Sequence, residues 1–206
     1  MPAAGALDTE AVADRTSDPR AARREALLDA ADRIVQRDGP AATMATIAGE
    51  AGITKPILYR HFGDKGGLYA ALADRYTGAL LEHLQAALEA GENRRDRVER
   101  TVGAYLASIE RDPQVYRFLL HSAEGAPALS QVRSFTRRLS ALLADGIVAE
   151  LAVPPTRAAA WAHGIVGMVQ SAGDWWLEGR SGRDAVSREQ LVHELTDLLF
   201  GAYGTS

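Results

Sequence analysis

Cysteine is missing from this sequence. Its absence excludes disulfide bonds, thiolate metal ligands and a cysteine nucleophile, and it favours a protein of the reducing cytoplasm. The chain also lacks runs of alternating Val, Ile and Thr, and its nineteen Gly and eight Pro mostly separate long Ala- and Leu-rich stretches. These features predict an all-α protein of about nine helices, large enough at 206 residues to bury a sizeable core.

Segments that would cross or enter a membrane are missing as well. No stretch is long and apolar enough to span a bilayer, so we expect no membrane partner. Residues 1–17 are rich in Ala, but Asp8, Glu10 and Asp14 interrupt them and no basic region opens them. This composition is typical of a flexible tail rather than a signal peptide.

The sequence carries none of the common catalytic signatures. Its five His are scattered, and His193-Glu194 is not followed by a second His at the HExxH spacing. The segment from Gly179 to Gly182 lacks the spacing of a nucleophile elbow, and neither a phosphate-binding loop nor a dinucleotide fingerprint occurs. We therefore predict that the protein is not an enzyme, with no catalytic residues, no metal and no cofactor.

Charge is unevenly distributed along the chain. The formal net charge is -4, yet residues 15–65 hold nine Lys and Arg against seven Asp and Glu. This segment is therefore mildly basic, at about +2, and leaves about -6 for the rest. A basic end on an acidic chain indicates local contact with an anion rather than binding over the whole surface.

Local signals predict the first two helices. The first helix should follow a cap at Ser17 or Asp18, carry Pro19 in its first turn and end at Gly39. A short helix capped by Thr43 should then run to about residue 51.

A second short helix and a long one follow. The Thr54 hydroxyl is expected to cap the short helix by accepting a backbone N–H, and Pro56 is tolerated in its first turn. That helix should end at Gly63, and a long helix should run from residue 65 to about residue 90. Five further helices are expected at about residues 93–110, 113–122, 127–151, 156–179 and 187–203.

Two short helices joined through a glycine turn, behind a longer supporting helix, are the pattern of a helix-turn-helix. In that geometry the second helix enters the major groove of DNA and its first residues face base edges. The candidate base readers are Thr54, Lys55, Pro56 and Ile57. Lys55 can donate to guanine, whereas Pro56 and Ile57 can contact thymine methyl groups.

Polar and basic groups flank these readers and can meet phosphate oxygens. The candidate phosphate contacts are Thr43, Tyr59, Arg60, His61 and Lys65. Taken one by one, these residues fit solvated charges around an ordinary helical hairpin better, and only their ordered combination favours DNA binding. Upstream, Arg15, Arg20, Arg23 and Arg24 form either a basic arm that adds contacts or a solvated helix face.

The stretch "TMATIAGEAGITKPILYRHFGDKGGLYAAL" resembles the DNA-binding domain of the tetracycline-repressor (TetR) family, and the resemblance covers about residues 20–70. It implies a DNA-binding domain over 18–66 and a helical effector-binding and dimerisation domain over 67–206. It also implies a homodimer on a palindromic double-stranded operator, with phosphate contacts at Thr43, Tyr59, His61 and Lys65. One departure is Gly66-Gly67, where helix formers are usual, so this helix start is expected to be weak.

Small and apolar residues on the last two helices predict a four-helix interface between two subunits. The candidate interface residues are Gly164, Gly167, Ser171, Leu191, Leu195, Leu198 and Leu199. Such an interface would set the two reading heads about 34–36 Å apart, one turn of DNA.

Aromatic and aliphatic residues in the middle helices either fill a core or line an effector pocket. The pocket candidates are Tyr105, Ile109, Tyr116, Phe118, Phe135, Leu139, Trp161, Met168 and Trp175, with Gln170, His121 or His163 as polar anchors. They suggest a small hydrophobic effector such as an acyl chain, a steroid-like ring or a drug. We therefore predict a ligand-responsive repressor, with a helical ligand-binding module that no longer binds DNA as the alternative.

Overall fold

The computed structural model describes residues 18–121, 126–179 and 185–203, and the tail expected over 1–17 lies outside them. Within these ranges the chain forms nine α-helices and one short 3₁₀ turn, without a strand, which confirms the all-α prediction. The elements are α1 (Pro19–Asp38), η1 (Gly39–Ala41), α2 (Met44–Glu50), α3 (Lys55–Phe62), α4 (Lys65–Glu89), α5 (Arg94–Arg111), α6 (Pro113–His121), α7 (Ala126–Leu151), α8 (Pro155–Gly179) and α9 (Arg188–Tyr203).

Three of the first four α-helices begin after a residue whose side chain caps the helix, at the positions that the sequence predicted. The carboxylate of Asp18 accepts from the backbone N–H of the second helical residue of α1, and Asp64 does the same for Gly67 in α4. Thr43 forms a reciprocal capping box at α2. The expectation for Thr54 needs correction, because its hydroxyl accepts no capping hydrogen bond and α3 begins with Pro56 in its first turn instead.

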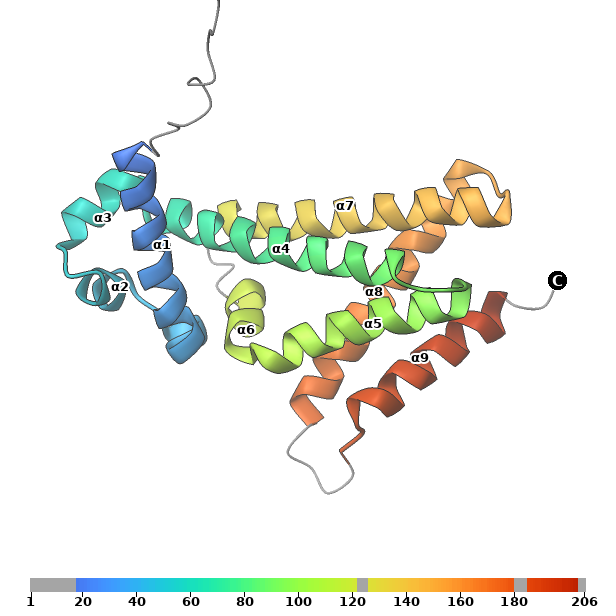
Figure 1. Ribbon diagram of the computed structural model, residues 1–206. Helices are drawn as coiled ribbons and strands as arrows, with labels where there is room; N and C mark the ends of the chain where they lie inside the picture. Colours follow the sequence, from blue (N-terminus) through green and yellow to red (C-terminus); the bar gives the residue numbers. More distant parts are fainter. Residues whose placement is uncertain (1–17, 122–125, 180–184, 204–206) are drawn as a thin grey trace, which may run out of the picture.

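The first three helices, α1 to α3, gather at one end of the molecule and share a core, here called the N-terminal core (Figure 1). This core draws on α4 and α6 as well, because Leu68, Leu72 and Phe118 are among its buried members. The edge of the Phe118 ring meets the Tyr69 ring with centroids 4.9 Å apart. Helices α4 and α6 are therefore attached to the helix-turn-helix by packing as well as by chain connection.

A second core, the C-terminal core, fills the space between α4, α5, α7, α8 and α9. Its buried residues are Leu84, Val102, Tyr105, Leu106, Ile109, Phe135, Val169, Trp176, Leu191 and Leu195. Trp176 also donates its indole N–H to the Val186 carbonyl at 2.8 Å, which ties the start of the α9 region to α8. The long α4 runs beside α7 from one core to the other (Figure 1).

Gly67 has a packing reason that the sequence did not reveal. A Cβ at this position would collide with the carbonyl oxygen of Phe62, the last residue of α3. The glycine thus allows α3 and α4 to approach closely, and it fixes the bend between them rather than merely weakening the helix start.

Phe118→Ala is expected to destabilise the protein by about 3–5 kcal/mol, because Phe118 is 1% exposed and its removal leaves a cavity in the N-terminal core. Leu120→Ala on the same helix is the control, since Leu120 is 39% exposed, and it should change the free energy of unfolding by no more than about 0.5 kcal/mol. Urea unfolding followed by circular dichroism measures both. Equal costs for the two variants would contradict this packing of α6.

Candidate nucleic-acid interface and ligand cavity

The start of α3 presents the predicted base readers to solvent. Thr54, Lys55 and Pro56 are exposed and Ile57 is half-buried, whereas Leu58 is fully buried in the N-terminal core. The turn before α3 contains Gly52 at a φ of 64°, a left-handed conformation that a glycine adopts without steric cost. Leu58 anchors α3 and the turn sets its direction, so the first residues of α3 can point away from the protein.

Positive charge from α1 and α3 meets beside these readers, on what we call the basic surface: Arg20, Arg23, Arg24, Arg60 and His61. Arg60 is exposed, and the Arg24 guanidinium lies over the Phe62 ring at 4.9 Å from its centroid. Partial burial, followed by the charges of Arg60 and then of the three α1 arginines, holds the pKa of His61 below its ordinary value. The α1 arginines therefore lie close enough to the end of α3 to act on His61 together with it.

The other predicted phosphate contacts lie at helix starts or on the exposed side of α3. Tyr59 is 40% exposed, and Thr43 and Lys65 are exposed at the first residues of α2 and α4. The Lys65 ammonium lies 5.1 Å from the centroid of the Tyr69 ring. The buried Tyr69 hydroxyl donates to the Ala42 carbonyl at 2.7 Å and so holds the residue next to Thr43. All nine predicted DNA contacts thus lie in one region, although Ile57 is only partly accessible.

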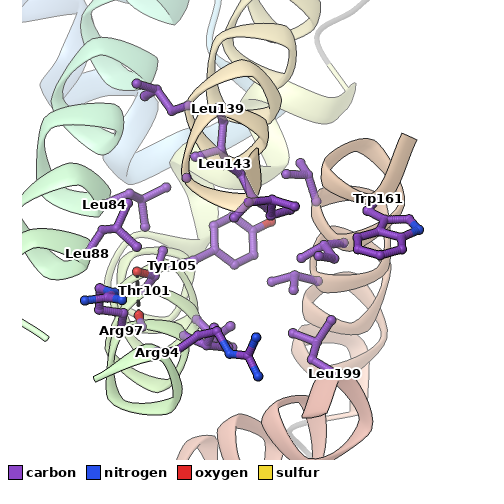
Figure 2. A pocket seen from close by; sticks show the side chains of 18 of the residues that line it. Leu84, Leu88, Arg94, Arg97, Thr101, Tyr105, Leu139, Leu143, Trp161 and Leu199 are labelled. Atoms are coloured by element: carbon purple, nitrogen blue, oxygen red, sulfur yellow. Dashed lines mark hydrogen bonds between the residues drawn. The ribbon is translucent and has the colours of Figure 1, made fainter. Parts of the chain in front are cut away.

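A cavity of about 490 Å³ lies in the C-terminal half, away from α3. Figure 2 shows it between α4, α5 and α7 on one side and α8 and α9 on the other. Most of its lining is aliphatic, and the main contributors are Leu84, Leu88, Val98, Val102, Leu142, Leu143, Ile147, Ile165, Val166, Val169 and Leu199. A volume in the range of roughly 300–1,000 Å³ with a mostly apolar lining is typical of a small-molecule site.

Of the nine predicted pocket residues, Tyr105, Leu139 and Trp161 line this cavity, as does the proposed anchor Gln170. The structure corrects the other six. Ile109, Phe135 and Met168 pack in or against the C-terminal core, and Tyr116 lies behind the cavity. Phe118 belongs to the N-terminal core, and Trp175 is 58% exposed.

Of the other two predicted polar anchors, His163 is exposed and does not line the cavity, and the side chain of His121 is outside the described part of the structure.

The cavity lining that the sequence missed is mostly aliphatic. The prediction favoured aromatic residues, but Leu, Ile and Val on α4, α5, α7, α8 and α9 form most of the wall. The repeat of Val98, Val102 and Tyr105 on α5 was the available signal, because it marks one apolar helix face.

A chain of hydroxyl groups leads from the cavity toward α6. The Tyr105 ring lines the cavity and its hydroxyl donates to the Tyr116 hydroxyl at 3.3 Å, while Tyr116 donates to the Asp174 carboxylate. Burial raises the pKa of Tyr105 to about 12 and also raises the pKa of Tyr116. Both tyrosines therefore remain protonated at neutral pH and act as donors in this network.

The predicted dimer residues fall into two groups. Gly164, Gly167 and Ser171 lie on the exposed face of α8, and Leu198 on α9 is 55% exposed. The expectation is corrected for Leu191 and Leu195, which are buried in the C-terminal core, where α9 packs on α5, and for Leu199, which lines the cavity. The inward face of α9 is thus used within one chain, and its other face is open.

The described residues show neither a metal-binding cluster nor a membrane span. They contain no group of three or more His, Cys, Asp or Glu placed to hold a metal ion. None of the helices in these ranges has the length and apolar character needed to cross a membrane.

Arg60→Gln is expected to raise the pKa of His61 part of the way toward its ordinary value, because it removes one of the two largest causes of the shift and leaves the burial. An NMR titration of the imidazole signals measures this. Arg100→Gln, on α5 and not among the groups that shift the His61 pKa, removes the same charge as a control and should leave the His61 pKa unchanged. An unchanged or lower pKa in Arg60→Gln would show that the basic surface is not assembled as described.

Comparisons with known proteins agree with this geometry. A family model described as "Bacterial regulatory proteins, tetR family" matches residues 27–72, which include α2, α3 and the start of α4. A second model, "Tetracyclin repressor-like, C-terminal domain", matches residues 83–206.

Curated relatives cover most of the chain. It is 33% identical over 162 residues to the HTH-type transcriptional activator FasR of Mycolicibacterium smegmatis, with 77% of this chain and 74% of the relative covered. It is 28% identical over 183 residues to the uncharacterised HTH-type transcriptional regulator Rv0472c of Mycobacterium tuberculosis, with 87% and 76% covered.

Solved structures share the fold. A tetR-family transcriptional regulator from Streptomyces coelicolor is 25% identical with a TM-score of 0.66, covering 88% of this chain and 83% of that one. A TetR-like regulator from Rhodococcus sp. RHA1 is 24% identical with a TM-score of 0.65, covering 91% and 100%. Because the C-terminal model alone matches more than half of the chain, this protein belongs to the tetR family of bacterial regulatory proteins.

Proposed function

We propose that the protein is a dimeric, ligand-responsive transcriptional repressor that binds a palindromic operator and is released by a small hydrophobic effector. One observation carries the proposal: a solvent-facing helix start with Lys55 and Pro56 is fixed by the buried Leu58, beside a basic surface, in a chain that also holds an apolar cavity. This function requires access to DNA, and it places the protein in the cytoplasm.

Residues 18–66 would read the DNA, with Thr54, Lys55, Pro56 and Ile57 in the major groove. Lys55 can donate to guanine O6 and N7, and Pro56 can contact a thymine methyl group. Phosphate oxygens would be bound by Thr43, Tyr59, Arg60, His61 and Lys65, which fix the register of the helix without reading sequence. The α1 arginines on the basic surface extend the phosphate contacts along the backbone.

The exposed face of α8 is the proposed centre of the dimer. A Cβ at Gly164 or Gly167 would meet no atom of the described residues within 4 Å, and neither helical glycine has a positive φ. Glycine in a helix costs roughly 0.8–1 kcal/mol relative to alanine, so no contact within the described part of the chain explains these two residues. Close approach of a second copy would explain them, and Ser171 and Trp175 on α8 and Leu198 on α9 are also exposed.

The cavity and the reading helices are connected by contacts that an effector can act on. Tyr105 lines the cavity and bonds to Tyr116 on α6, while Phe118 on the opposite side of α6 packs on Tyr69. Tyr69 in turn holds the Ala42 carbonyl, one residue before Thr43, the cap of α2. An effector that fits better when α6 and α4 shift would move the reading heads out of register, by no more than its differential affinity.

The sign of control is a separate question from DNA binding. FasR, the relative at 33% identity, is a transcriptional activator, so transcription in vitro from a promoter with the selected operator should be measured with and without the protein. We expect the transcript to fall in its presence.

The central experiment selects bound sequences from random duplex DNA and measures their affinity as salt is raised. We expect a palindrome bound by two chains, with affinity falling steeply with salt. Lys65→Ala should reduce the slope of log K against log salt by about one and weaken all sequences alike, whereas Lys55→Ala should relax sequence preference. Arg100→Ala, far from the interface, is the control that removes a charge without changing the slope.

The alternative function gives a different result in this experiment. A helical ligand-binding module without DNA binding would dimerise and take up ligand, but would not be retained on any duplex even in dilute buffer. That result would overturn the proposed function.

Gly167→Leu is expected to weaken the dimer at least about fivefold, because overpacking a close helix contact costs about 1–3 kcal/mol. Sedimentation velocity over a range of protein concentrations measures the dissociation constant. Gly49→Leu is the matched control, since Gly49 is an exposed helical glycine on α2 that also has open space around it. A dimer that tolerates Gly167→Leu as well as Gly49→Leu would place the interface elsewhere.

A further inference from the structure

The polarity of the cavity is one-sided. Around Val102, Tyr105, Leu139 and Val169 its wall is apolar apart from Thr101, Tyr105 and Gln170. All four charged lining residues, Glu89, Arg94, Arg97 and Glu150, come from the last turn of α4, the first turn of α5 and the last turn of α7. A ligand that fills this space therefore needs an apolar body and a polar end.

The lining is also long. On α5 it extends from Arg94 to Tyr105, which at the helical rise of about 1.5 Å per residue spans about 16 Å. On α7 it extends in the opposite chain direction from Leu139 to Glu150, over the same length. Figure 2 shows Leu139 at one end of the cavity and Arg94 and Arg97 at the other. This shape suits an extended alkyl chain better than a compact ring system.

At the charged end, most side chains are already paired. Arg97 bonds to Glu150, and Arg95 bonds to Glu99 and Asp197. Arg94 differs, because no carboxylate of the described residues lies within 4.0 Å of its guanidinium, which stacks on the Phe200 ring at 5.1 Å. Figure 2 shows this guanidinium between α5 and Leu199.

The position of Arg94 favours an anion. It is the first residue of the 18-residue α5, so the free N–H groups of that helix start add to its charge. Arg97 is one turn further along and can exchange Glu150 for a ligand anion, since guanidinium groups bind carboxylates and phosphates with two N–H donors. The opposing charges in the lining are Glu150, which is paired with Arg97, and Glu89, which is exposed at the end of α4.

We propose that the cavity binds a long, unbranched acyl chain whose anionic head group lies at Arg94 and Arg97. The head is a carboxylate in a free fatty acid or the phosphates of a coenzyme A thioester, and the tail extends toward Tyr105 and Leu139. The inference rests on the proposed function only in taking this cavity as the effector site.

Calorimetric titration with palmitate, palmitoyl-CoA, coenzyme A alone, hexadecanol and hexadecylamine, each below its micelle concentration, tests the sign of the head group. We expect one of the two anionic acyl probes to bind at least about tenfold tighter than hexadecanol, because hydrogen bonds to charged groups exceed neutral ones by that order. The comparison of palmitate with palmitoyl-CoA distinguishes the two sources. Tightest binding by hexadecanol, by hexadecylamine or by coenzyme A alone would overturn the proposal.

A chain-length series from octanoyl to palmitoyl tests the body of the site. Each added methylene should tighten binding by about fourfold until the cavity is full. An affinity that does not depend on chain length would contradict an acyl site.

Two variants test the anchor. Arg94→Gln should weaken the anionic acyl probe about tenfold and leave hexadecanol unchanged. Glu89→Gln at the same end is the matched control and should leave acyl binding unchanged or tighter. The reverse pattern, with Glu89→Gln weakening binding and Arg94→Gln harmless, would show that the site takes a cation.

Ile165→Trp, which fills the cavity, should abolish binding of every probe while operator binding persists, and retained binding would place the acyl site elsewhere.

Operator affinity measured in the same preparation separates this inference from the proposed function. Acyl binding with no DNA binding, or with no effect on it, would sustain the ligand class and reject the regulatory role. Operator binding that is released by a neutral ring compound, with no acyl uptake, would sustain the regulatory role and reject the ligand class.

Discussion

The structure depends on the contact between Tyr69 and Phe118 inside the N-terminal core. Tyr69 belongs to α4 and Phe118 to α6, and both helices continue into or touch the half of the molecule that holds the cavity. The Tyr69 hydroxyl also fixes the Ala42 carbonyl, next to Thr43, the cap of α2. Because a packed core has few alternative arrangements, a shift of α4 or α6 must change where the helix-turn-helix stands.

A second set of contacts orients α4 against α1. Arg75 pairs with Glu25 and Asp29, and the Tyr76 hydroxyl donates to Asp32, with burial as the main cause that raises the pKa of Tyr76. The ion pairs are largely exposed, so their contribution to stability is small. These ion pairs join α4 to α1, and they help to fix the angle between the two helices beside the packed core.

The separation of the two sites decides how regulation can work. The cavity lies between α4, α5, α7, α8 and α9, and none of its lining residues belongs to α1, α2 or α3. A ligand in this cavity therefore does not touch α3. Under the proposed function its effect would pass through α4 or α6, by shifts of helix position rather than by direct competition with DNA.

The sequence by itself determined most helix positions and the helix-turn-helix, because the signals are local. Asp18, Thr43 and Asp64 cap helices within a few residues of themselves, and the order from Gly52 to Lys65 already contains the turn, the predicted base readers and the flanking cations. Only the tertiary structure decided which apolar residues face a neighbouring helix, a cavity or solvent. On α9 alone, Leu195 packs in the core, Leu199 lines the cavity and Leu198 is exposed. The same three outcomes hold for the aromatic residues Phe118, Trp161 and Trp175, in that order. The reason is that the partner of an apolar side chain is set by segments far away in the chain. Arg94 shows the same limit, since its lack of a carboxylate partner becomes visible only when α5, α7 and α9 are packed together.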